Sequence, residues 1–118
     1  QVFVDADRNR IFQVLSNLIV NAIKYGRDGG SVDISFNIMS EQYVLVEVID
    51  DGLGIDEDNL LKIFQRFYRV DKSGGRKFGG SGLGLSIVKH ILEAHEQTLN
   101  VNSKVGVGST FSFTLKLA

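Results

Sequence analysis

The sequence predicts a two-layer α/β sandwich in which helices cover one face of a mixed β-sheet. Two observations support this prediction. Apolar residues recur at helical spacing in two separate stretches, 7–25 and 83–92. Four other stretches alternate apolar with polar residues or are rich in β-branched residues, as strands are: 32–38, 43–49, 99–103 and 110–117. Because no repeat or interior linker divides the chain, we expect residues 1–118 to form a single domain.

Composition limits the functional classes. The 118 residues are 43% hydrophobic and 23% charged, which is enough to bury a core and excludes disorder. Thirteen basic and fourteen acidic residues nearly cancel, so we expect neither nucleic-acid binding nor direct membrane contact. The lack of cysteine excludes disulfides and thiolate metal sites. No apolar run approaches ~18 residues, so no membrane span is expected, and a start at Gln1 suggests a piece of a larger protein.

The elements follow from local patterns. The first helix is predicted over Asp7–Tyr25 with Asp5 as its N-cap, and Gly26–Gly30 reads as a stop and turn. Two strands follow, joined by a polar turn at Ser40–Gln42. A short helix is predicted over Glu57–Phe64. Beyond it the chain has an aperiodic stretch, a second amphipathic helix and two more strands: 69–81, 83–92, 99–103 and 110–117.

The polar face of the first helix is the first candidate site. Gln13, Asn17, Asn21 and Lys24 follow each other at steps of four, four and three, so they project from one side. Such a stripe is often only solvated surface. Asparagine is a mediocre helix former, however, and its carboxamide oxygen is a ligand that Mg²⁺ accepts beside phosphate oxygens.

A second candidate follows the most apolar strand, at Asp50. Alternation places this carboxylate on the same face as the buried valines of the strand, where it needs a hydrogen-bond donor. The exocyclic amine of a purine is one such donor, and a turn in which the aspartate caps its own backbone is the alternative. Gly52 and Gly54 permit either, through positive φ or close approach of a flat ligand.

Glycines and basic residues precede the second helix. Gly80, Gly82 and Gly84 leave backbone N–H groups uncovered at a helix N-terminus, which favours anion binding, although a flexible hinge is an alternative. A basic stretch just before them suits either an active-site lid or a solvated surface loop: Arg66, Arg69, Lys72, Arg76 and Lys77.

These features in this order resemble the ATP-binding catalytic domain (HATPase_c, GHKL superfamily) of bacterial two-component sensor histidine kinases. The resemblance rests on five boxes across nearly the whole chain: NLIVNAIKY (Asn17–Tyr25), DDGLGI (Asp50–Ile55), IFQRFYRVD (Ile63–Asp71), GGSGLGLSIVKHI (Gly79–Ile91) and GVGSTF (Gly106–Phe111). It implies the Bergerat-type ATP-binding sandwich shared with gyrase, Hsp90 and MutL. It also implies a flexible ATP lid at about 67–81.

The resemblance implies a role for each matching residue. Asn21 would be the Mg²⁺ ligand, Asn17 would support the metal and phosphates, and Asp50 would accept from the adenine amine. Arg69 would approach the γ-phosphate. The remaining nucleotide-binding residues would be Lys24 at the phosphates, Tyr25 beside the nucleotide, Gly52, Gly54 and Ile55 in the box beneath the base, Phe64 and Phe67 at the base of the lid, Gly80, Gly82, Leu83, Gly84 and Leu85 at the phosphate edge, and Thr110 in the adenine network.

The implied activity is transfer of the γ-phosphoryl group of Mg-ATP to a histidine on a separate dimerisation domain, with Asn17, Lys24 and Arg69 as the catalytic set. Hydrolytic members of the superfamily that this chain resembles have the pattern Glu-x-x-x-Asn. In this chain Asn17 stands at the glutamate position and cannot act as a base. Alternatives are an ATP-sensing regulatory module, a GHKL ATPase and a serine kinase. The resemblance further implies a cytoplasmic domain, alone or as part of a membrane-anchored sensor, that is monomeric when isolated and serves a response regulator indirectly.

Two histidines and one departure complete the sequence evidence. His90 and His95 lie on or near the second helix, and we expect them to be structural, because the helix that bears the phospho-acceptor is absent. The kinases that this chain resembles usually have two glycines at the positions where it has Glu96 and Gln97. We therefore expect a strained left-handed turn there, or a turn built differently.

Overall fold

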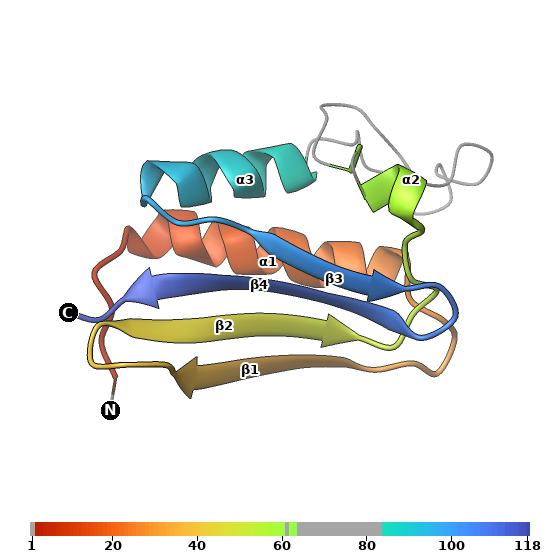
Figure 1. Ribbon diagram of the computed structural model, residues 1–118, viewed down its shortest axis with the longest axis horizontal. Coiled ribbons are helices and arrows are strands. Elements are labelled where there is room, and N and C mark those ends of the chain that lie inside the picture. Colours follow the sequence, from red (N-terminus) through yellow and green to blue (C-terminus); the bar gives the residue numbers. More distant parts are fainter. Residues whose placement is uncertain (1, 61, 64–83) are drawn as a thin grey trace.

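A four-stranded sheet, two helices packed on one of its faces and one short helix make up the fold over the described residues. The structure is a computed structural model that describes residues 2–60, 62–63 and 84–118. Its strands lie in the order β1-β2-β4-β3, and α1 and α3 lie side by side on one face of the sheet (Figure 1). The predicted two-layer sandwich is therefore confirmed. The elements in chain order are α1 (Arg8–Lys24), β1 (Val32–Ile38), β2 (Tyr43–Asp50), α2 (Glu57–Leu60), α3 (Gly84–Ala94), β3 (Asn100–Lys104) and β4 (Gly108–Lys116).

The sheet is antiparallel in every pairing within the described ranges, so the prediction of a mixed sheet is wrong. After α3 the chain enters at the edge as β3 and returns through a short turn as β4, which lies between β3 and β2. This order depends on pairing between strands far apart in the sequence. Apolar alternation within each strand specifies which face is buried and does not specify the neighbour.

The first helix starts at a different cap from the predicted one. Asp7 is the N-cap, since its Oδ1 accepts a hydrogen bond from the Arg10 N–H at 3.1 Å. Asp5 instead donates its backbone N–H to the Lys116 carbonyl, beside the isolated bridge between Val4 and Leu117. An N-cap side chain accepts from an unpaired backbone N–H group in the first turn of the helix, and Asp7 does so three residues before Arg10.

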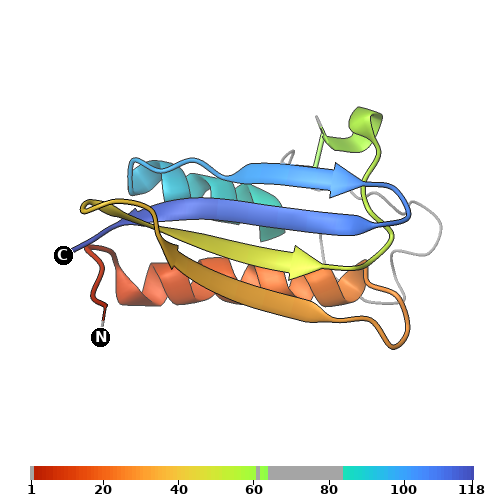
Figure 2. The same cartoon turned by 60° about the horizontal axis from the view of Figure 1, so that its bottom comes forward.

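The core lies between the helices and the sheet, on the face that both views show covered by α1 and α3 (Figures 1 and 2). Val14 and Leu18 of α1, Leu92 of α3 and Phe113 of β4 are at most 1% exposed, and each contributes about 1.5–3 kcal/mol by leaving water. β1 is less covered. Phe36 points to the helix side, opposite buried Val46, yet is 62% exposed because β1 is an edge strand.

Three further segments bear on the predictions. The polar turn at 40–42 is confirmed, since the Ser40 hydroxyl accepts from the Gln42 and Tyr43 N–H groups. The short helix is found over Glu57–Leu60, and the rest of its predicted span includes residues outside the described ranges. No helix in the described ranges is long and apolar enough to cross a membrane.

Glu96 ends α3 in a left-handed conformation. Its φ is 59°, its N–H donates to the Glu93 carbonyl, and the Gln97 N–H donates to the Leu92 carbonyl. These two bonds form a Schellman motif, in which glycine is the usual residue at the left-handed position. The prediction of a strained left-handed turn at this point is confirmed.

Replacing Glu96 with glycine should raise the free energy of unfolding by roughly 0.5–1 kcal/mol, because glycine adopts this φ without the Cβ clash that glutamate suffers. Urea unfolding followed by circular dichroism measures the change. The matched control is Glu93→Gly, an exposed position inside α3, where glycine should lower stability by about 1 kcal/mol. A loss of stability in both variants would contradict the account of Glu96.

Candidate nucleotide-binding site

The asparagine face of α1 meets the start of α3. Ile11, Val14, Leu18 and Ala22 bury the opposite stripe of α1 against the core, which leaves Asn17 and Asn21 half-buried on the flank. The Asn17 side-chain amide donates to the Gly84 carbonyl at 3.5 Å. Two boxes that are separated by 67 residues are thereby brought together at the N-terminus of α3.

The C-terminal end of α1 carries the predicted cation and aromatic ring. Lys24 Nζ lies 5.7 Å from the centroid of the Tyr25 ring, within the range of a cation–π contact. Tyr25 is the C-cap, and its carbonyl accepts from the Leu53 N–H at 3.2 Å. The end of this helix is therefore attached directly to the turn that follows Asp50.

Asp50 closes β2 on the helix side of the sheet. It lies opposite Val32 on one neighbouring strand and Ser109 on the other. Its Oδ1 accepts from the Gly52 N–H at 2.9 Å, so the aspartate does cap its own turn. Oδ2 has no hydrogen bond to any described residue, which leaves one carboxylate oxygen for an external donor.

The glycines after Asp50 are required by the packing of the protein itself. A Cβ on Gly52 would lie 2.6 Å from the Tyr25 carbonyl oxygen. Gly54 has a φ of +76°, and a Cβ there would lie 2.2 Å from the Lys104 carbonyl oxygen. Ile55, which the resemblance places in the nucleotide site, has its side chain in the core at 7% exposure. Close backbone contacts within the protein are thus sufficient to explain both glycines in this structure.

Ser109, and not Thr110, lies beside Asp50. Thr110 is opposite Ile49, and alternation along β2 directs that pair to the face away from the helices. Ser109 is 6% exposed, and its hydroxyl oxygen lies 2.6 Å from that of Ser103, which also accepts from the Ile55 N–H at 2.7 Å. The GVGSTF box offers two adjacent hydroxyl residues, and only the strand register distinguishes them.

The start of α3 is only partly described. A Cβ on Gly84 would meet no described atom within 4 Å, so packing among the described residues does not demand glycine there. Leu85 is half-buried against the core. Six predicted site residues lie outside the described ranges: Phe64, Phe67, Arg69, Gly80, Gly82 and Leu83.

Asp51, next to Asp50, has a structural role. Its Oδ1 accepts from the Ser31 N–H at 2.9 Å, and this bond, the Ser31 hydroxyl and the nearby Arg27 charge hold the pKa of the Asp51 carboxyl below its ordinary value of 3.8. Desolvation opposes them. The contact joins the start of β1 to the turn after β2.

The Asp51 pKa predicts a pH effect on stability. Because the folded value is lowered, the carboxylate stabilises the fold fully above pH 3.8, and this contribution is lost as pH falls through the folded pKa. Asp51→Asn should therefore reduce stability at pH 7, and its difference from the wild type should shrink as the pH falls below 3.8. Urea unfolding at a series of pH values measures this. A difference that is constant with pH would contradict it.

The two histidines lie away from Asp50. His95 Nε2 accepts from the Asp7 N–H at 3.0 Å, and its Nδ1 lies 2.8 Å from the Ile91 carbonyl, so the ring joins the end of α3 to the start of α1. The structural role predicted for His95 is confirmed. His90 is exposed on α3. Within the described ranges, no cluster of three histidine, cysteine or acidic residues could hold a metal.

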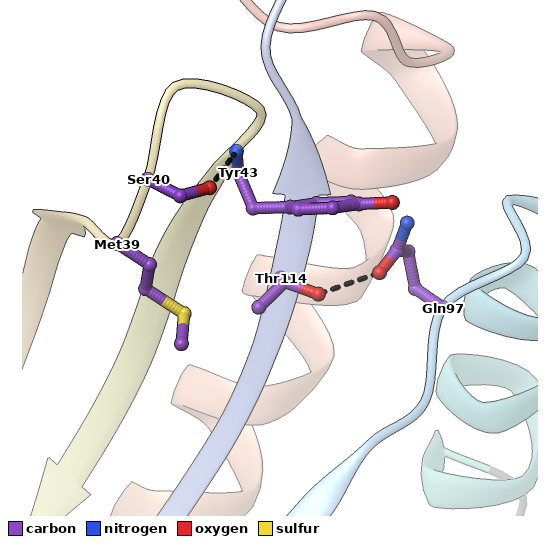
Figure 3. Close-up of a pocket in the computed structure, with 5 residues that line it drawn as sticks. All are labelled: Met39, Ser40, Tyr43, Gln97 and Thr114. Carbon is purple, nitrogen blue, oxygen red and sulfur yellow. Dashed lines mark hydrogen bonds between the residues drawn. The ribbon is translucent and has the colours of Figure 1, made fainter.

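A separate pocket of about 230 Å³ lies at the other end of the sheet. Figure 3 shows the Thr114 hydroxyl hydrogen-bonded to the Gln97 side chain, with the Tyr43 ring next to this pair. Tyr43 starts β2 and Asp50 ends it, so this pocket is not part of the candidate site.

An antiparallel sheet with both helices on one face, and an asparagine-bearing helix beside an Asp-Gly turn at one end, is the arrangement of an α/β-sandwich nucleotide-binding domain. The chain belongs to the HATPase_c family, described as histidine kinase-, DNA gyrase B-, and HSP90-like ATPases, whose profile matches residues 6–118. The family match implies use of ATP.

Known relatives agree with this assignment. The chain is 44% identical over 115 residues to sensor histidine kinase WalK of Bacillus subtilis (strain 168), covering 97% of this chain and 19% of that protein. It is 41% identical over 117 residues to sensor histidine kinase RppB of Synechocystis sp. (strain PCC 6803), covering 99% and 26%. The solved structure of full-length ShkA in complex with AMPPNP superposes with a TM-score of 0.85 at 30% identity, covering 100% and 24%. The chain thus spans about a fifth to a quarter of these proteins.

Proposed function

We propose that this chain is the ATP-binding catalytic domain of a bacterial sensor histidine kinase, which donates the γ-phosphoryl group of ATP to a histidine on a dimerisation domain outside this chain. The observation that carries the proposal is the Asp50 carboxylate. One of its oxygens is held by the Gly52 N–H, and the other would accept from an adenine amine. The relatives named above support the proposal, since they are sensor histidine kinases.

The phosphate end of the nucleotide would lie between α1 and the start of α3. Asn17 and Gly84 are in contact there, and uncovered N–H groups at a helix N-terminus attract anions. Lys24, one turn beyond Asn21, would neutralise phosphate charge. We assign Arg69 and the glycines at 80 and 82 to the same end from the resemblance, and a lid at about 67–81 would cover it.

Mg²⁺ fits the donor set of this face. The Asn21 carboxamide is a neutral oxygen donor on the half-buried flank of α1, and Mg²⁺ accepts such an oxygen together with phosphate oxygens and water. When bound, the ion would neutralise phosphate charge. Asn21 would hold the metal, and Asn17 would orient the phosphates beside it.

The absence of a base at Asn17 explains why the γ-phosphoryl group would persist. A carboxamide takes no proton at neutral pH, so water in the site is a poor nucleophile. Transfer would then wait for a histidine imidazole from the dimerisation domain, with positioning and charge neutralisation supplied by this chain. A response regulator would receive the phosphoryl group later, and the isolated chain would be a cytoplasmic monomer.

The experiment that tests this function uses ATP with a radiolabelled γ-phosphate. The chain is incubated with and without the histidine-bearing helical domain of a relative such as WalK. Label should reach histidine only in the mixture. Steady release of phosphate by the chain alone would support an ATPase instead. Omission of Mg²⁺ should weaken ATP binding, and an unchanged affinity would refute the role of Asn21.

A further inference from the structure

Arg27 joins two turns that lie beside Asp50. It stands in the loop between α1 and β1, where its carbonyl accepts from the Gly30 N–H at 2.9 Å. Its terminal nitrogen Nη2 donates to the Gly52 carbonyl at 3.0 Å and to the Gly106 carbonyl at 2.9 Å. Gly52 belongs to the turn after β2, and Gly106 to the turn between β3 and β4.

The two turns also touch directly. The Gly106 N–H donates to the Leu53 carbonyl at 2.9 Å, and Gly54 approaches the Lys104 carbonyl so closely that a Cβ would not fit. With Arg27 in place, two carbonyl oxygens converge on one cationic nitrogen. Without that nitrogen, both carbonyls would lose a charge-assisted hydrogen bond. Among the described residues, the Gly106 to Leu53 bond, the bond from the Ile55 N–H to Ser103 at the end of β3, and packing would then hold the two turns together.

We infer that Arg27 is a positioning residue for the adenine end of the nucleotide site: by bridging the Gly52 and Gly106 carbonyls, its guanidinium holds the turn that aims the free oxygen of Asp50. This inference rests on the proposed function, which places the adenine at Asp50. The residue acts through Gly52, whose N–H holds Asp50 Oδ1 and whose carbonyl accepts from Arg27.

The position of Arg27 predicts which ligands its loss affects. The guanidinium acts on the base end of the site, so Arg27→Met should weaken ATP and ADP binding by the same factor, roughly tenfold. The extra affinity that Mg²⁺ confers on ATP should be unchanged, because the metal would lie at Asn21. A role at the γ-phosphate would weaken ATP more than ADP.

The test compares Arg27→Met with Arg8→Met, which removes the same charge from an exposed position at the start of α1. Amide hydrogen exchange is followed by NMR in the nucleotide-free chain, and calorimetry gives the dissociation constants of ATP and ADP. In Arg27→Met, protection of the Gly106 and Leu53 N–H groups should fall at least tenfold, while that of Val46 and Phe113 in the central strands stays unchanged. Arg8→Met should match the wild type in both measurements.

The outcomes separate the inference from the function on which it rests. If the wild type binds neither ATP nor ADP, the proposed function fails. If the wild type binds both and Arg27→Met binds them equally well, the positioning role alone is overturned. The role is also overturned if protection at Gly106 and Leu53 is unchanged, or if protection falls equally in the central strands. A local loss of protection with equal weakening of ATP and ADP supports it.

Discussion

Replacing Asp50 with asparagine should weaken ATP binding roughly thirtyfold, which corresponds to about 2 kcal/mol. The carboxylate has two acceptor oxygens, and one already accepts from the Gly52 N–H. Asparagine has one acceptor oxygen for two donors, the Gly52 N–H and the adenine amine. Whichever donor it serves, the other is left unpaired in a partly buried place, and an unpaired group costs about 1–3 kcal/mol.

The control for this prediction is Asp33→Asn. Asp33 is an exposed aspartate on β1 whose loss changes the net charge by the same amount. Calorimetric titration of the wild type and both variants with ATP and ADP gives the affinities, and thermal unfolding confirms that each variant is folded. Equal affinities in Asp50→Asn and Asp33→Asn would remove Asp50 from the adenine site.

A second large effect is expected in stability, at Gly54. Gly54→Ala should lower the free energy of unfolding by about 2–4 kcal/mol. The left-handed φ of +76° costs alanine about 1 kcal/mol. The added Cβ would also lie 2.2 Å from the Lys104 carbonyl oxygen, which is backbone and cannot rotate away, and such overpacking costs about 1–3 kcal/mol more.

Gly29 separates these two costs. Its φ of +73° is nearly that of Gly54, and a Cβ there would meet no described atom within 4 Å. Gly29→Ala should therefore lose only the conformational part, about 1 kcal/mol. Urea unfolding of both variants measures the difference. Equal losses of stability in Gly54→Ala and Gly29→Ala would show that the close approach of residue 54 to the Lys104 carbonyl adds no cost for alanine.

Local patterns in the sequence were sufficient to predict the helices and strands and the face that each of them buries. The helical spacing in α1 and α3 and the alternation in β2 and β4 were confirmed within a few residues at each boundary. Errors arose where the answer depends on distant segments. The N-cap is Asp7 rather than Asp5, and β4 separates β3 from β2 in a sheet that is antiparallel rather than mixed.

The candidate site shows the same division. The family resemblance implied that the asparagine helix and the start of α3 meet at the phosphates, and strand alternation predicted the inward-facing Asp50. The resemblance named Thr110 for the adenine network, whereas the register with β2 places Ser109 beside Asp50. Arg27 had no signal in the sequence, because a single arginine in a polar loop has no period and no motif.

Residue types and their spacing therefore determined which side chains are available: an asparagine face, a carboxylate at a strand end and glycines before a helix. These depend on neighbours along the chain, and a periodicity of two or 3.6 residues is enough to predict them. Tertiary structure decided which of these groups meet. Strand order and register bring Ser109 to Asp50, and the turn packing brings Arg27 to Gly52 and Gly106, because such pairings depend on shape and hydrogen bonding between segments far apart in sequence.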